Sequence, residues 1–514
     1  MRLRQIRPRY AFAALFVIAC SAEIELIATD ASTSDETKVT SSPTPIYVLP
    51  PVLAFPTAEG FGAGARGGRG GRVVFVTNLA DSGVGSLRDA LSGSQGTGPR
   101  IVVFRVSGTI ALSSNILLRE ANSFVTVAGQ SAPGDGVQLK NYGIDIREGA
   151  HDVIIRHLRV RPGLDKATST GTQFFPGIAL WGSNGKNVYN VMIDHSSVEW
   201  CSDESTSAWD WTTRSTIQWS IIGEGMSPTA YPYNAGAYGK GLITGGAANG
   251  DKLQLSVHHN LFAHTMGRNP YLQRADVIDF VNNVIYNWPC NNAISVGSAC
   301  ILNTGNTYGA KANFVNNHYI RGPLSTCVDL AFLEGKTING ITTSQLYVKG
   351  NWGPYCPTGC TDDWNFHFTE LRYPNCYPGH YDTSGRYSLA APPEKFRSSV
   401  RFNAPLVALT PTANLKSSVL ADVGATRPMR DSLDARIVDS VRTLSNRGTY
   451  GTYPVLASAP ALEDTDRDGM PNSWELAHGL SPTNASDGPL VAHNGYTNVE
   501  NYLNELAGDS ISCL

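Results

Sequence analysis

Val257-His-His-Asn260 and Phe280-Val-Asn-Asn283 are two of six short segments that share one pattern. In each, an apolar residue is followed by two variable residues and then by Asn or Ser. The other four are Ile193-Asp-His-Ser196, Ile217-Gln-Trp-Ser220, Phe314-Val-Asn-Asn317 and Val348-Lys-Gly-Asn351. Successive polar positions lie 24, 40, 23, 34 and 34 residues apart, which indicates a base coil of about 23 residues with insertions.

This repeat predicts an all-β fold, a right-handed parallel β-helix in which each coil stacks on the next. A polar residue that recurs once per coil stacks on itself, so buried Asn amides can bond one another and nearby turn carbonyls. Stacked coils need closed ends, and Ser86-Leu-Arg-Asp-Ala-Leu91 predicts a short N-terminal capping helix, with Ser86 and Asp89 resembling a capping box. A β-sandwich also uses short strands, but the near-constant spacing with Asn in register favours the β-helix.

The composition supports a large folded β protein. Of 514 residues, 42% are apolar and 16% are charged, and the chain holds 51 Gly and 29 Pro. A disordered chain would carry more charge and fewer aromatic residues, and frequent turns fit a β-rich chain. The net charge of −3 provides no basic surface for nucleic acid, so we expect no nucleic-acid partner.

The chain begins with the features of an export signal. Four arginines within the first nine residues precede an apolar run at 11–19, which is too short to cross a bilayer. We therefore expect a signal peptide at 1–22, a Ser/Thr/Pro-rich linker at 23–52, and a secreted, cell-surface or periplasmic protein without a membrane span. Val17-Ile-Ala-Cys20 also resembles a lipobox, so lipidation of Cys20 and ordinary cleavage near Ala22 both stay open.

Export makes most of the cysteines disulfide candidates, because disulfides persist in oxidising compartments. The candidates are Cys290, Cys300, Cys327, Cys356, Cys360, Cys376 and Cys513. Cys201 lies in a strand-like segment and is expected to be a buried apolar side chain. Cys356-Pro-Thr-Gly-Cys360 resembles half a zinc site, but no second ligand pair has matching spacing, which favours a disulfide. The adjacent His258 and His259 are expected on opposite faces of a strand, which makes them poor joint metal ligands.

Polar residues gather at three places between the predicted strands. Four carboxylates occur within eleven residues, at Asp194, Glu199, Asp203 and Glu204. Ca²⁺ binds several such oxygens, and the alternative is that they are solvated acids at strand ends. Lys240 stands among glycines and is suited to meet a substrate carboxylate as a point charge. Arg268 precedes Asn269-Pro270, where the proline favours an extended Asn269 and so holds Arg268 in a fixed direction.

Residues 464–475 match a twelve-residue calcium loop. The sequence is Asp464-Thr-Asp466-Arg-Asp468-Gly469-Met470-Pro-Asn-Ser-Trp-Glu475. Acids fill positions 1, 3, 5 and 12, glycine fills position 6, and Met470 stands at position 7, which binds through its carbonyl oxygen. We predict Ca²⁺ binding here, in a small structural element at 456–514 that follows a β-helix domain at 53–455. Residues 355–450 match no motif and are expected to form loops and a tail packed along the helix.

The chain resembles secreted bacterial pectate lyases, which are parallel β-helix polysaccharide lyases. The resemblance covers about residues 54–350, and a C-terminal calcium loop accompanies such lyases. The stretches that carry it are Ala54-Phe-Pro-Thr-Ala-Glu-Gly-Phe-Gly62, Gly67-Gly-Arg-Gly-Gly71, Thr77-Asn-Leu-Ala-Asp-Ser-Gly83, Gly85-Ser-Leu-Arg-Asp-Ala90, Val103-Phe-Arg-Val-Ser-Gly-Thr-Ile110, Val127-Ala-Gly-Gln-Ser-Ala-Pro-Gly134, Asp194-His195, Asp203-Glu204, Gly239-Lys240-Gly241 and Gly267-Arg268-Asn-Pro270. Together these motifs are specific, although each alone is weak.

The resemblance implies a Ca²⁺-assisted β-elimination on polygalacturonate, by a chain that we expect to be a monomer. Arg268 maps onto the family's base and Lys240 onto the lysine that contacts the substrate carboxylate. Asp194 and Asp203 map onto calcium ligands, with Glu204 as an added candidate. Arg274, His264 and Asn269 are predicted to contact substrate.

The sequence departs from the family at two places. The family often has an acid where Ser207 stands, and its downstream arginines are replaced in Tyr271-Leu-Gln273-Arg274. Two alternatives therefore remain open. One is an enzyme for another acidic polysaccharide, including a hydrolase that uses Asp194 and Asp203 as its carboxylate pair. The other is a non-catalytic carbohydrate-binding β-helix. A lyase needs Arg268, whereas neither a hydrolase nor a binding protein does.

Overall fold

The computed structural model describes most of the chain after residue 51. The described residues are 52–163, 176–183, 185–226, 239–245, 253–273, 275–288, 310–325, 344–366, 397–448 and 452–510, with strand segments at 295–296, 331–334, 337–338, 341–342 and 368–371. They all belong to one compact unit. The predicted signal peptide, nearly all of the linker, Cys20 and Arg274 lie outside the described residues.

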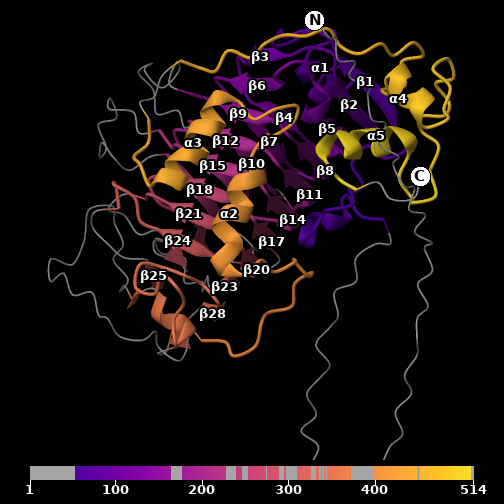
Figure 1. The fold of residues 1–514 in the computed structure, drawn as a ribbon. Coiled ribbons are helices and arrows are strands. Elements are labelled where there is room, and N and C mark those ends of the chain that lie inside the picture. Colours follow the sequence, from indigo (N-terminus) through magenta and orange to yellow (C-terminus); the bar gives the residue numbers. More distant parts are fainter. Residues whose placement is uncertain are drawn as a thin grey trace, which may run out of the picture. The chain divides into compact units, whose positions relative to one another are not determined.

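Three long sheets contain most of the strands (Figure 1). Sheet A holds, in spatial order, β1 (Arg72–Val76), β2 (Arg100–Phe104), β5 (Val125–Ala128), β8 (His151–Arg156), β11 (Val188–Asp194), β14 (Thr212–Gln218), β17 (Gln254–His258), β20 (Ala275–Val281), β23 (Ala310–Val315) and β28 (Gln345–Lys349). Sheet B holds β3 (Gly108–Ala111), β6 (Val137–Lys140), β9 (Arg159–Arg161), β12 (Ser197–Glu199), β15 (Ile221–Gly223), β18 (Leu261–Ala263), β21 (Val284–Tyr286) and β24 (His318–Ile320). Sheet C holds β4 (Ile116–Leu118), β7 (Ile144–Arg147), β10 (Ile178–Trp181), β13 (Glu204–Trp209), β16 (Lys240–Gly245), β19 (Tyr271–Leu272) and β22 (Ser295–Val296).

The strand order defines a parallel β-helix. Neighbours in each sheet come from successive coils, and they pair in parallel, as β11 does with β8 and β14. A β-sandwich is built of antiparallel strands, so the predicted β-helix is confirmed and the sandwich is excluded. Two small sheets lie apart from this pattern, β25 (Ala331–Glu334) with β29 (Phe368–Leu371) and β26 (Thr337–Ile338) with β27 (Ile341–Thr342).

The repeated polar residues form a buried hydrogen-bond ladder along the helix. The Asn260 backbone N–H donates to Asn283 Oδ1 at 3.1 Å, and that of Asn283 donates to Asn317 Oδ1 at 2.9 Å. Each side-chain amide also donates to a carbonyl of a preceding strand, as Asn283 Nδ2 does to Val257 O at 2.8 Å. Ser220 and Asn351 extend the ladder at its two ends. Because these polar atoms satisfy one another, their burial costs little, as the repeat predicted.

The predicted N-terminal cap is present as α1 (Leu87–Ser92). Ser86 Oγ accepts the Asp89 N–H, while Leu87, Ala90 and Leu91 are buried in the main core. The Asp89 carboxylate accepts from Ser94 N–H at 2.8 Å, so the Ser86–Asp89 pair supplies half of a capping box. The helix therefore covers the apolar interior at the first coils.

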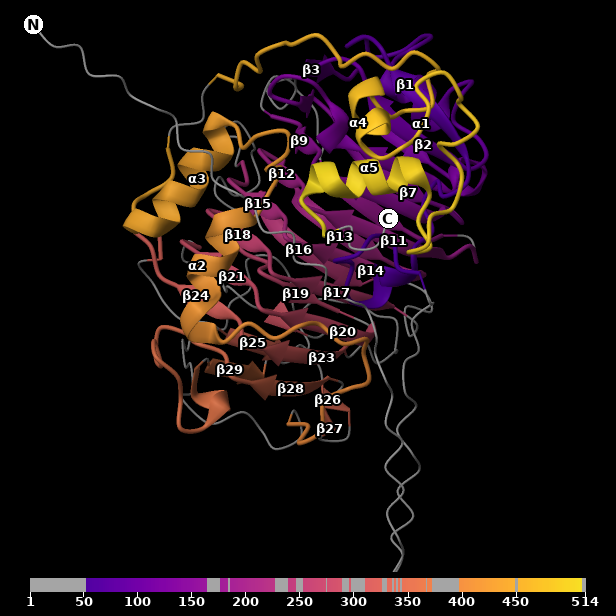
Figure 2. The same cartoon turned by 45° about the vertical axis from the view of Figure 1, so that its right-hand side comes forward.

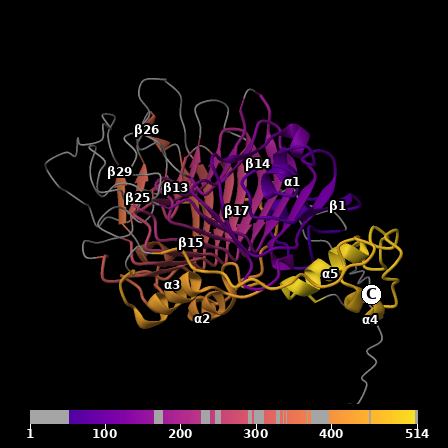
Figure 3. The same cartoon turned by 90° about the horizontal axis from the view of Figure 1, so that it is seen from above.

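The C-terminal part of the chain packs along the outside of the coils (Figures 2 and 3). Helices α2 (Thr412–Asp422) and α3 (Ser432–Thr443) bury apolar side chains against sheet B, among them Ile437 against Leu261 and Tyr286. Residues 355–450 were expected to form loops and a tail packed along the helix, and the described segment 397–448 does pack there, although these two helices were not foreseen. Helices α4 (Asn472–Ala477) and α5 (Asn498–Ala507) lie against the first strands of sheet A.

Short 3₁₀-helices complete the described secondary structure. They are η1 (Phe61–Gly64), η2 (Glu120–Asn122), η3 (Gly129–Ser131) and η5 (Asp363–Phe366). Among the described helices, none is both long and apolar enough to cross a membrane.

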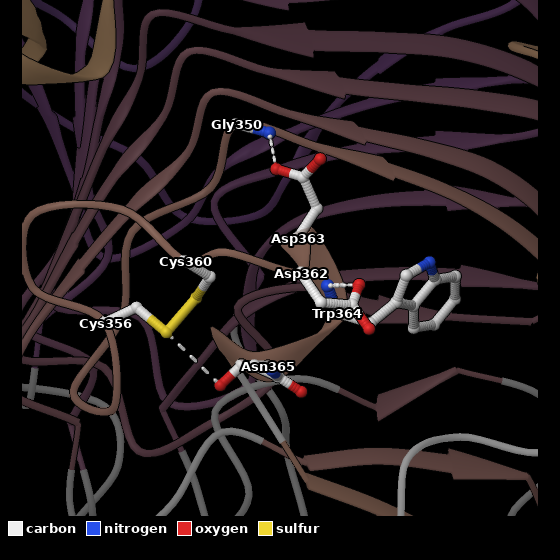
Figure 4. The surroundings of a disulfide bond; sticks show 7 residues. All are labelled: Gly350, Cys356, Cys360, Asp362, Asp363, Trp364 and Asn365. Carbon is white, nitrogen blue, oxygen red and sulfur yellow. Dashed lines mark hydrogen bonds between the residues drawn. A yellow bond between two sulfur atoms is a disulfide. The ribbon is translucent and has the colours of Figure 1, made fainter.

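Cys356 and Cys360 form a disulfide within one loop (Figure 4). The same loop is fixed by the Asp363 carboxylate, which accepts the Gly350 N–H at 2.7 Å. The predicted disulfide is therefore confirmed, and the zinc alternative is excluded because both thiols are consumed. Cys201 is a buried free thiol, as predicted. Cys290, Cys300, Cys327, Cys376 and Cys513 lie outside the described residues.

Candidate active site

A cavity of about 480 Å³ lies over the outer face of sheet C. Its walls come from β7, β10, β13 and β16 and from the loop before β19. The lining residues are Asp145, Arg147, Pro176, Ala179, Trp181, Asp203, Glu204, Ser207, Trp209, Lys240, Ile243 and Arg268. Four residues singled out in the sequence, Asp203, Glu204, Lys240 and Arg268, thus meet in one place.

Cross-strand register explains how residues distant in sequence meet there. Aligned residues of parallel neighbours stand side by side, because adjacent strands lie only about 4.8 Å apart. Glu204 on β13 aligns with Lys240 on β16. Further along the same strands, Ser207 aligns with Ile243 and with Ala179 on β10. The cavity therefore has Glu204 and Lys240 together at the starts of β13 and β16, whereas Arg147 lies at the end of β7.

The loop before β19 carries Arg268 over this charged end. The Arg268 carbonyl accepts the Leu242 N–H at 2.7 Å, and the Gly267 carbonyl accepts the Gly241 N–H at 3.0 Å. A Cβ atom at Gly241 would collide with the Arg268 carbonyl and with Asn269 Oδ1, so only glycine lets this loop approach. The Arg268 guanidinium pairs with the Glu204 carboxylate and lies 5.5 Å from the centroid of the Tyr271 ring.

Burial shifts the ionisation of the charged groups in the cavity. It lowers the pKa of Lys240 to about 8, although the nearby Asp203 carboxylate opposes the shift. Burial also lowers the pKa of Arg268 below the usual arginine value. The same desolvation raises the pKa of Asp203, against the pull of Arg268 and Lys240. Lys240 Nζ donates to the Met266 carbonyl at 3.1 Å, so its ammonium group is held in place.

The cavity provides two carboxylates to a divalent cation. Asp203 and Glu204 are adjacent at the start of β13, and the Ser207 hydroxyl lies on the same strand. Ca²⁺ takes six to eight oxygens, so these side chains fit a cation that shares its remaining positions with water and an acidic ligand. They do not form a complete protein site.

Asp194 does not belong to this cavity. It lies at the end of β11 in sheet A, fully buried, where Oδ2 accepts from Arg156 Nε at 2.8 Å and Oδ1 bonds His195 Nδ1 at 2.8 Å. Arg156 also pairs with Asp509 of the C-terminal element at 2.9 Å. This placement contradicts the predicted role of Asp194 as a calcium ligand beside Asp203. Its carboxylate instead holds the arginine onto which the C-terminal element docks.

Two predicted substrate contacts also lie elsewhere. His264 is buried beneath α3, with Nε2 at 2.8 Å from Ser440 Oγ and Nδ1 at 2.8 Å from Asn287 Nδ2. Asn269 is buried beneath the loop of Arg268, where Oδ1 accepts from Thr265 Oγ1 at 2.6 Å. Both placements contradict the predicted contact with substrate, because a fully buried side chain cannot line the cavity. The prediction for Arg274 falls outside the described residues.

The expectation for the two adjacent histidines was wrong. β17 ends at His258, and His259 has a φ of 54°, so strand alternation does not extend to it. The two Nδ1 atoms lie 3.1 Å apart, and Glu59 is close enough to share one ion with them.

The predicted calcium loop forms a compact acidic cradle. Carboxylate oxygens of Asp464, Asp466 and Asp468 lie within 4.8 Å of one another, and so do those of Asp468, Glu475 and Asp487. Five buried oxygens in this cradle have no hydrogen-bond partner: one each on Asp466, Asp468 and Asp487, and both on Glu475. Unpaired buried carboxylate oxygens are costly without a cation, so this donor set fits Ca²⁺. The Met470 side chain is buried against β2 and β5, at the loop position that binds through its carbonyl.

Asp487 was missed by sequence reasoning. It lies twelve residues beyond the loop and reaches it because Gly488 passes close to Asp468, where a Cβ would stand 2.5 Å from Asp468 Oδ2. No spacing rule for a single loop predicts such a contact. Trp181, Trp209, Asp145 and Arg147 were also missed, because their convergence depends on cross-strand register.

Comparison with known proteins identifies the family. The chain is 33% identical over 463 residues to the probable pectate lyase C of Aspergillus fumigatus, covering 88% of this chain and 94% of that protein. It is 34% identical over 464 residues to the probable pectate lyase C of Neosartorya fischeri, again covering 88% and 94%. The chain belongs to the pectate lyase family. Members of this family are polysaccharide lyases. These relatives are fungal, so the bacterial origin of the resemblance is not confirmed.

Comparisons with family models and with solved structures give less information about the family. No protein-family model matches the chain. Among solved structures, a pectate lyase of Bacillus subtilis aligns with a TM-score of 0.45 and 16% identity, covering 72% of this chain and 97% of that one. Pectate lyase II of Xanthomonas campestris aligns with a TM-score of 0.43 and 16% identity, covering 73% and 100%. The fold assignment here accordingly stands on the strand order.

Proposed function

We propose that this protein cleaves polygalacturonate by β-elimination in the cavity over sheet C. The observation that carries the proposal is the meeting of Arg268 and Lys240 with two carboxylates in one cavity. β-Elimination removes the proton at C5 of a uronate unit and expels the glycosidic oxygen at C4. It therefore needs a group that neutralises the C5 carboxylate and a base that faces the C5 proton.

Lys240 is suited to the first task. The C5–H bond is a very weak acid while the adjacent carboxylate is negative, and pairing with an ammonium group stabilises the charge that develops there. Bound Ca²⁺ would supply further neutralisation of the same carboxylate, and Asp203 and Glu204 are the residues that would hold it. Glu204 is buried, so its charge interactions are stronger than they would be in bulk water.

Arg268 is suited to the second task. A free guanidinium is protonated at any ordinary pH, but burial lowers the pKa of Arg268, although the Asp203 carboxylate opposes the shift. The loop that carries Arg268 is anchored by backbone bonds to β16. The side chain therefore stays beside Lys240, within the same cavity as the carboxylate that Lys240 binds.

The alternative of a hydrolase has no support from the two residues suggested for it. A hydrolase needs two carboxyl groups that flank one glycosidic bond, and the suggested pair was Asp194 and Asp203. Asp194 is buried in sheet A and paired with Arg156. The two side chains therefore do not share a substrate site.

The C-terminal loop is proposed to hold a second, structural Ca²⁺. Asp464, Asp466, Asp468 and Glu475 are its proposed ligands, with the Met470 carbonyl. Export as a monomer, by the signal at 1–22, belongs to the same proposal, because a wall polysaccharide is met outside the cytoplasm. Mass spectrometry of the mature N-terminus would show whether Cys20 is lipidated.

The test is product formation from polygalacturonate in excess Ca²⁺, followed by the ultraviolet absorbance of the unsaturated product. Wild type is expected to produce it, and Arg268→Ala is expected to lose at least about a thousandfold in rate, within the range typical of a lost catalytic proton transfer. Arg442→Ala, which changes an exposed arginine on α3, the helix packed against sheet B, serves as the matched control. Release of reducing ends without the absorbance would identify a hydrolase, and no cleavage at all would favour a binding protein.

A further inference from the structure

A row of large side chains crosses the end of the cavity opposite Lys240 and Arg268. Arg147 on β7, Trp181 on β10 and Trp209 on β13 are aligned in register, and all three line the cavity. Trp181 is 40% exposed, an unusual position for so large an apolar side chain on the outer face of a sheet. Exposed aromatic surface inside a polar cavity is a feature of ligand sites.

Both indole rings are fixed by their surroundings. Trp181 Nε1 donates to Asp210 Oδ2 at 3.2 Å, and the Arg147 guanidinium carbon lies 4.9 Å from the Trp181 ring centroid. The Trp209 ring leans toward Gly245, where a Cβ would stand 3.2 Å from the ring and where φ is +152°. A fixed aromatic surface binds a flat apolar face with little loss of side-chain entropy.

Among the residues that line this end of the cavity, none offers a free cation. Arg147 pairs with the buried Asp145 carboxylate at 2.8 Å, and Asp145 also accepts from Asn115 Nδ2 at 3.1 Å. The guanidinium is therefore already neutralised by a partner that is itself held in place. The cations that can meet a free carboxylate, Lys240 and Arg268, stand at the other end, at the strand starts. The cavity thus has one half suited to an anionic ring and one half suited to a neutral ring.

We propose that Trp181 and Trp209 form a stacking subsite for an uncharged hexose ring of the substrate chain. The ring is a methyl-esterified uronate or a neutral sugar, since both present a C–H face without a charge. The preferred substrate is then a partly neutral galacturonan, with a free carboxylate at Lys240 and an uncharged unit over the two indoles. This inference deepens the proposed function and rests on it for the identity of the chain.

Binding tests the subsite without catalysis. Calorimetric titration of the full-length Arg268→Ala protein would use three probes: an unesterified galacturonate oligomer, its methyl-esterified counterpart and a neutral galactan oligomer. Adding Trp181→Ala is expected to weaken a neutral-ring probe about tenfold, which corresponds to about 1.4 kcal/mol, and to leave the unesterified probe within about twofold. The ester and galactan arms tell which neutral ring is bound. Trp211→Ala, a tryptophan two residues from Trp209 that does not line the described cavity, is the matched control.

Kinetics on the active enzyme provide a second readout. Trp181→Ala and Trp209→Ala are expected to raise KM on partly esterified pectin by a larger factor than KM on polygalacturonate. Equal weakening of all three probes, or no change in any, would overturn the subsite. If Trp209→Ala fails to fold, the exposed Trp181 carries the test alone. An inactive wild type that still binds neutral rings through Trp181 would refute the proposed reaction and support the subsite.

Discussion

Ser207 is the residue that we expect to set the Ca²⁺ concentration that activity in the cavity requires. It lies between Ala179 and Ile243 on the cavity floor, three residues after Glu204 on β13. We predict that Ser207→Asp lowers the Ca²⁺ concentration for half-maximal activity about tenfold, because a third carboxylate adds a ligand oxygen. The measurement is initial rate against Ca²⁺ concentration. Ser207→Asn, which adds size without charge, should leave the half-saturating concentration near that of wild type, and an equal shift in both variants would argue against the cation.

Residue identity predicted part of the site and missed the rest for a geometric reason. Asp203, Glu204, Lys240 and Arg268 were found because charged residues are rare in this chain. Two clustered acids, a lysine among glycines and an arginine before Asn-Pro therefore stand out. Asp194 has the same chemistry but belongs to another sheet, and its distance along the chain from Asp203 does not reveal this. Trp181 and Trp209 were invisible because only register across β10 and β13 brings them together.

At the scale of elements, a turn between sheets contains a stack of buried rings. The His195 ring stacks with those of His157 at 5.0 Å and Trp219 at 5.8 Å, and Trp219 stacks with His259 at 4.5 Å. His195 Nδ1 bonds Asp194, and Nε2 lies 3.4 Å from Asp422 Oδ2 at the end of α2. The stack therefore joins sheet A to the helix that covers sheet B.

Because of this arrangement, we expect the free energy of unfolding to fall at alkaline pH. Burial opposes the charged form, but the Asp194 carboxylate outweighs it and raises the pKa of His195 to about 9. Because this value is above the unfolded value of about 6.5, the contribution of His195 is complete below about pH 6.5 and is lost as pH rises through about 9. We predict a fall in unfolding free energy of up to about 3 kcal/mol over this window. Urea denaturation at several pH values measures it, and His195→Gln should flatten the profile; an unchanged wild-type midpoint would contradict the linkage.

The asparagine ladder should be the most sensitive element of the coil stack. Asn283 accepts the Asn260 N–H and donates to the Val257 carbonyl, and both partners are buried. Asn283→Ala would leave these groups without partners, at a cost of about 1–3 kcal/mol each. We predict a loss of about 3 kcal/mol or more in unfolding free energy, measured by denaturant titration. Asn414→Ala, at an exposed position of α2, should change stability by less than about 0.5 kcal/mol; similar losses at both sites would show that the ladder is unimportant.

The fold was predictable from the sequence because of this ladder, whereas its C-terminal covering was not. A residue that repeats once per coil reports stacking directly, so the Asn and Ser positions revealed the β-helix. Helices α2 and α3 carry no comparable repeat, and their position follows from contacts with sheet B that no local pattern encodes. The calcium loop lies between these cases, since Asp464 to Glu475 matched a spacing rule but Asp487 reached the cradle only through the fold.

At the scale of the whole molecule, the calcium element packs on the outer face of the first strands of sheet A. Met470, Val499 and Tyr502 pack on Ile101 and Val103, and Asp464 pairs with Arg105 at 3.4 Å. Without a cation the clustered acids are desolvated and repel one another, which raises the pKa of both Asp468 and Glu475 to about 7. We predict that chelation lowers the melting temperature, because an ion at a hundred times its Kd stabilises the fold by about 2.7 kcal/mol. Calorimetry in Ca²⁺ and in chelator measures this, and Glu475→Gln should remove most of the difference; identical melting curves for wild type would contradict the site.

Two proposed calcium sites in one molecule make a chelator experiment ambiguous, but they can be separated by crossing variants with readouts. Glu475 lies in the C-terminal element, whereas Ser207 lies in the cavity over sheet C. If each ion acts at its own site, Glu475→Gln shifts the Ca²⁺ dependence of the melting temperature and leaves that of activity, measured well below the melting temperature, unchanged. Ser207→Asp does the reverse. If each variant shifts only its own readout in this way, the C-terminal ion keeps the coils stacked and the cavity ion serves the reaction. A parallel shift of both readouts by Glu475→Gln would instead show that activity depends on Ca²⁺ only through the folded state of the first coils.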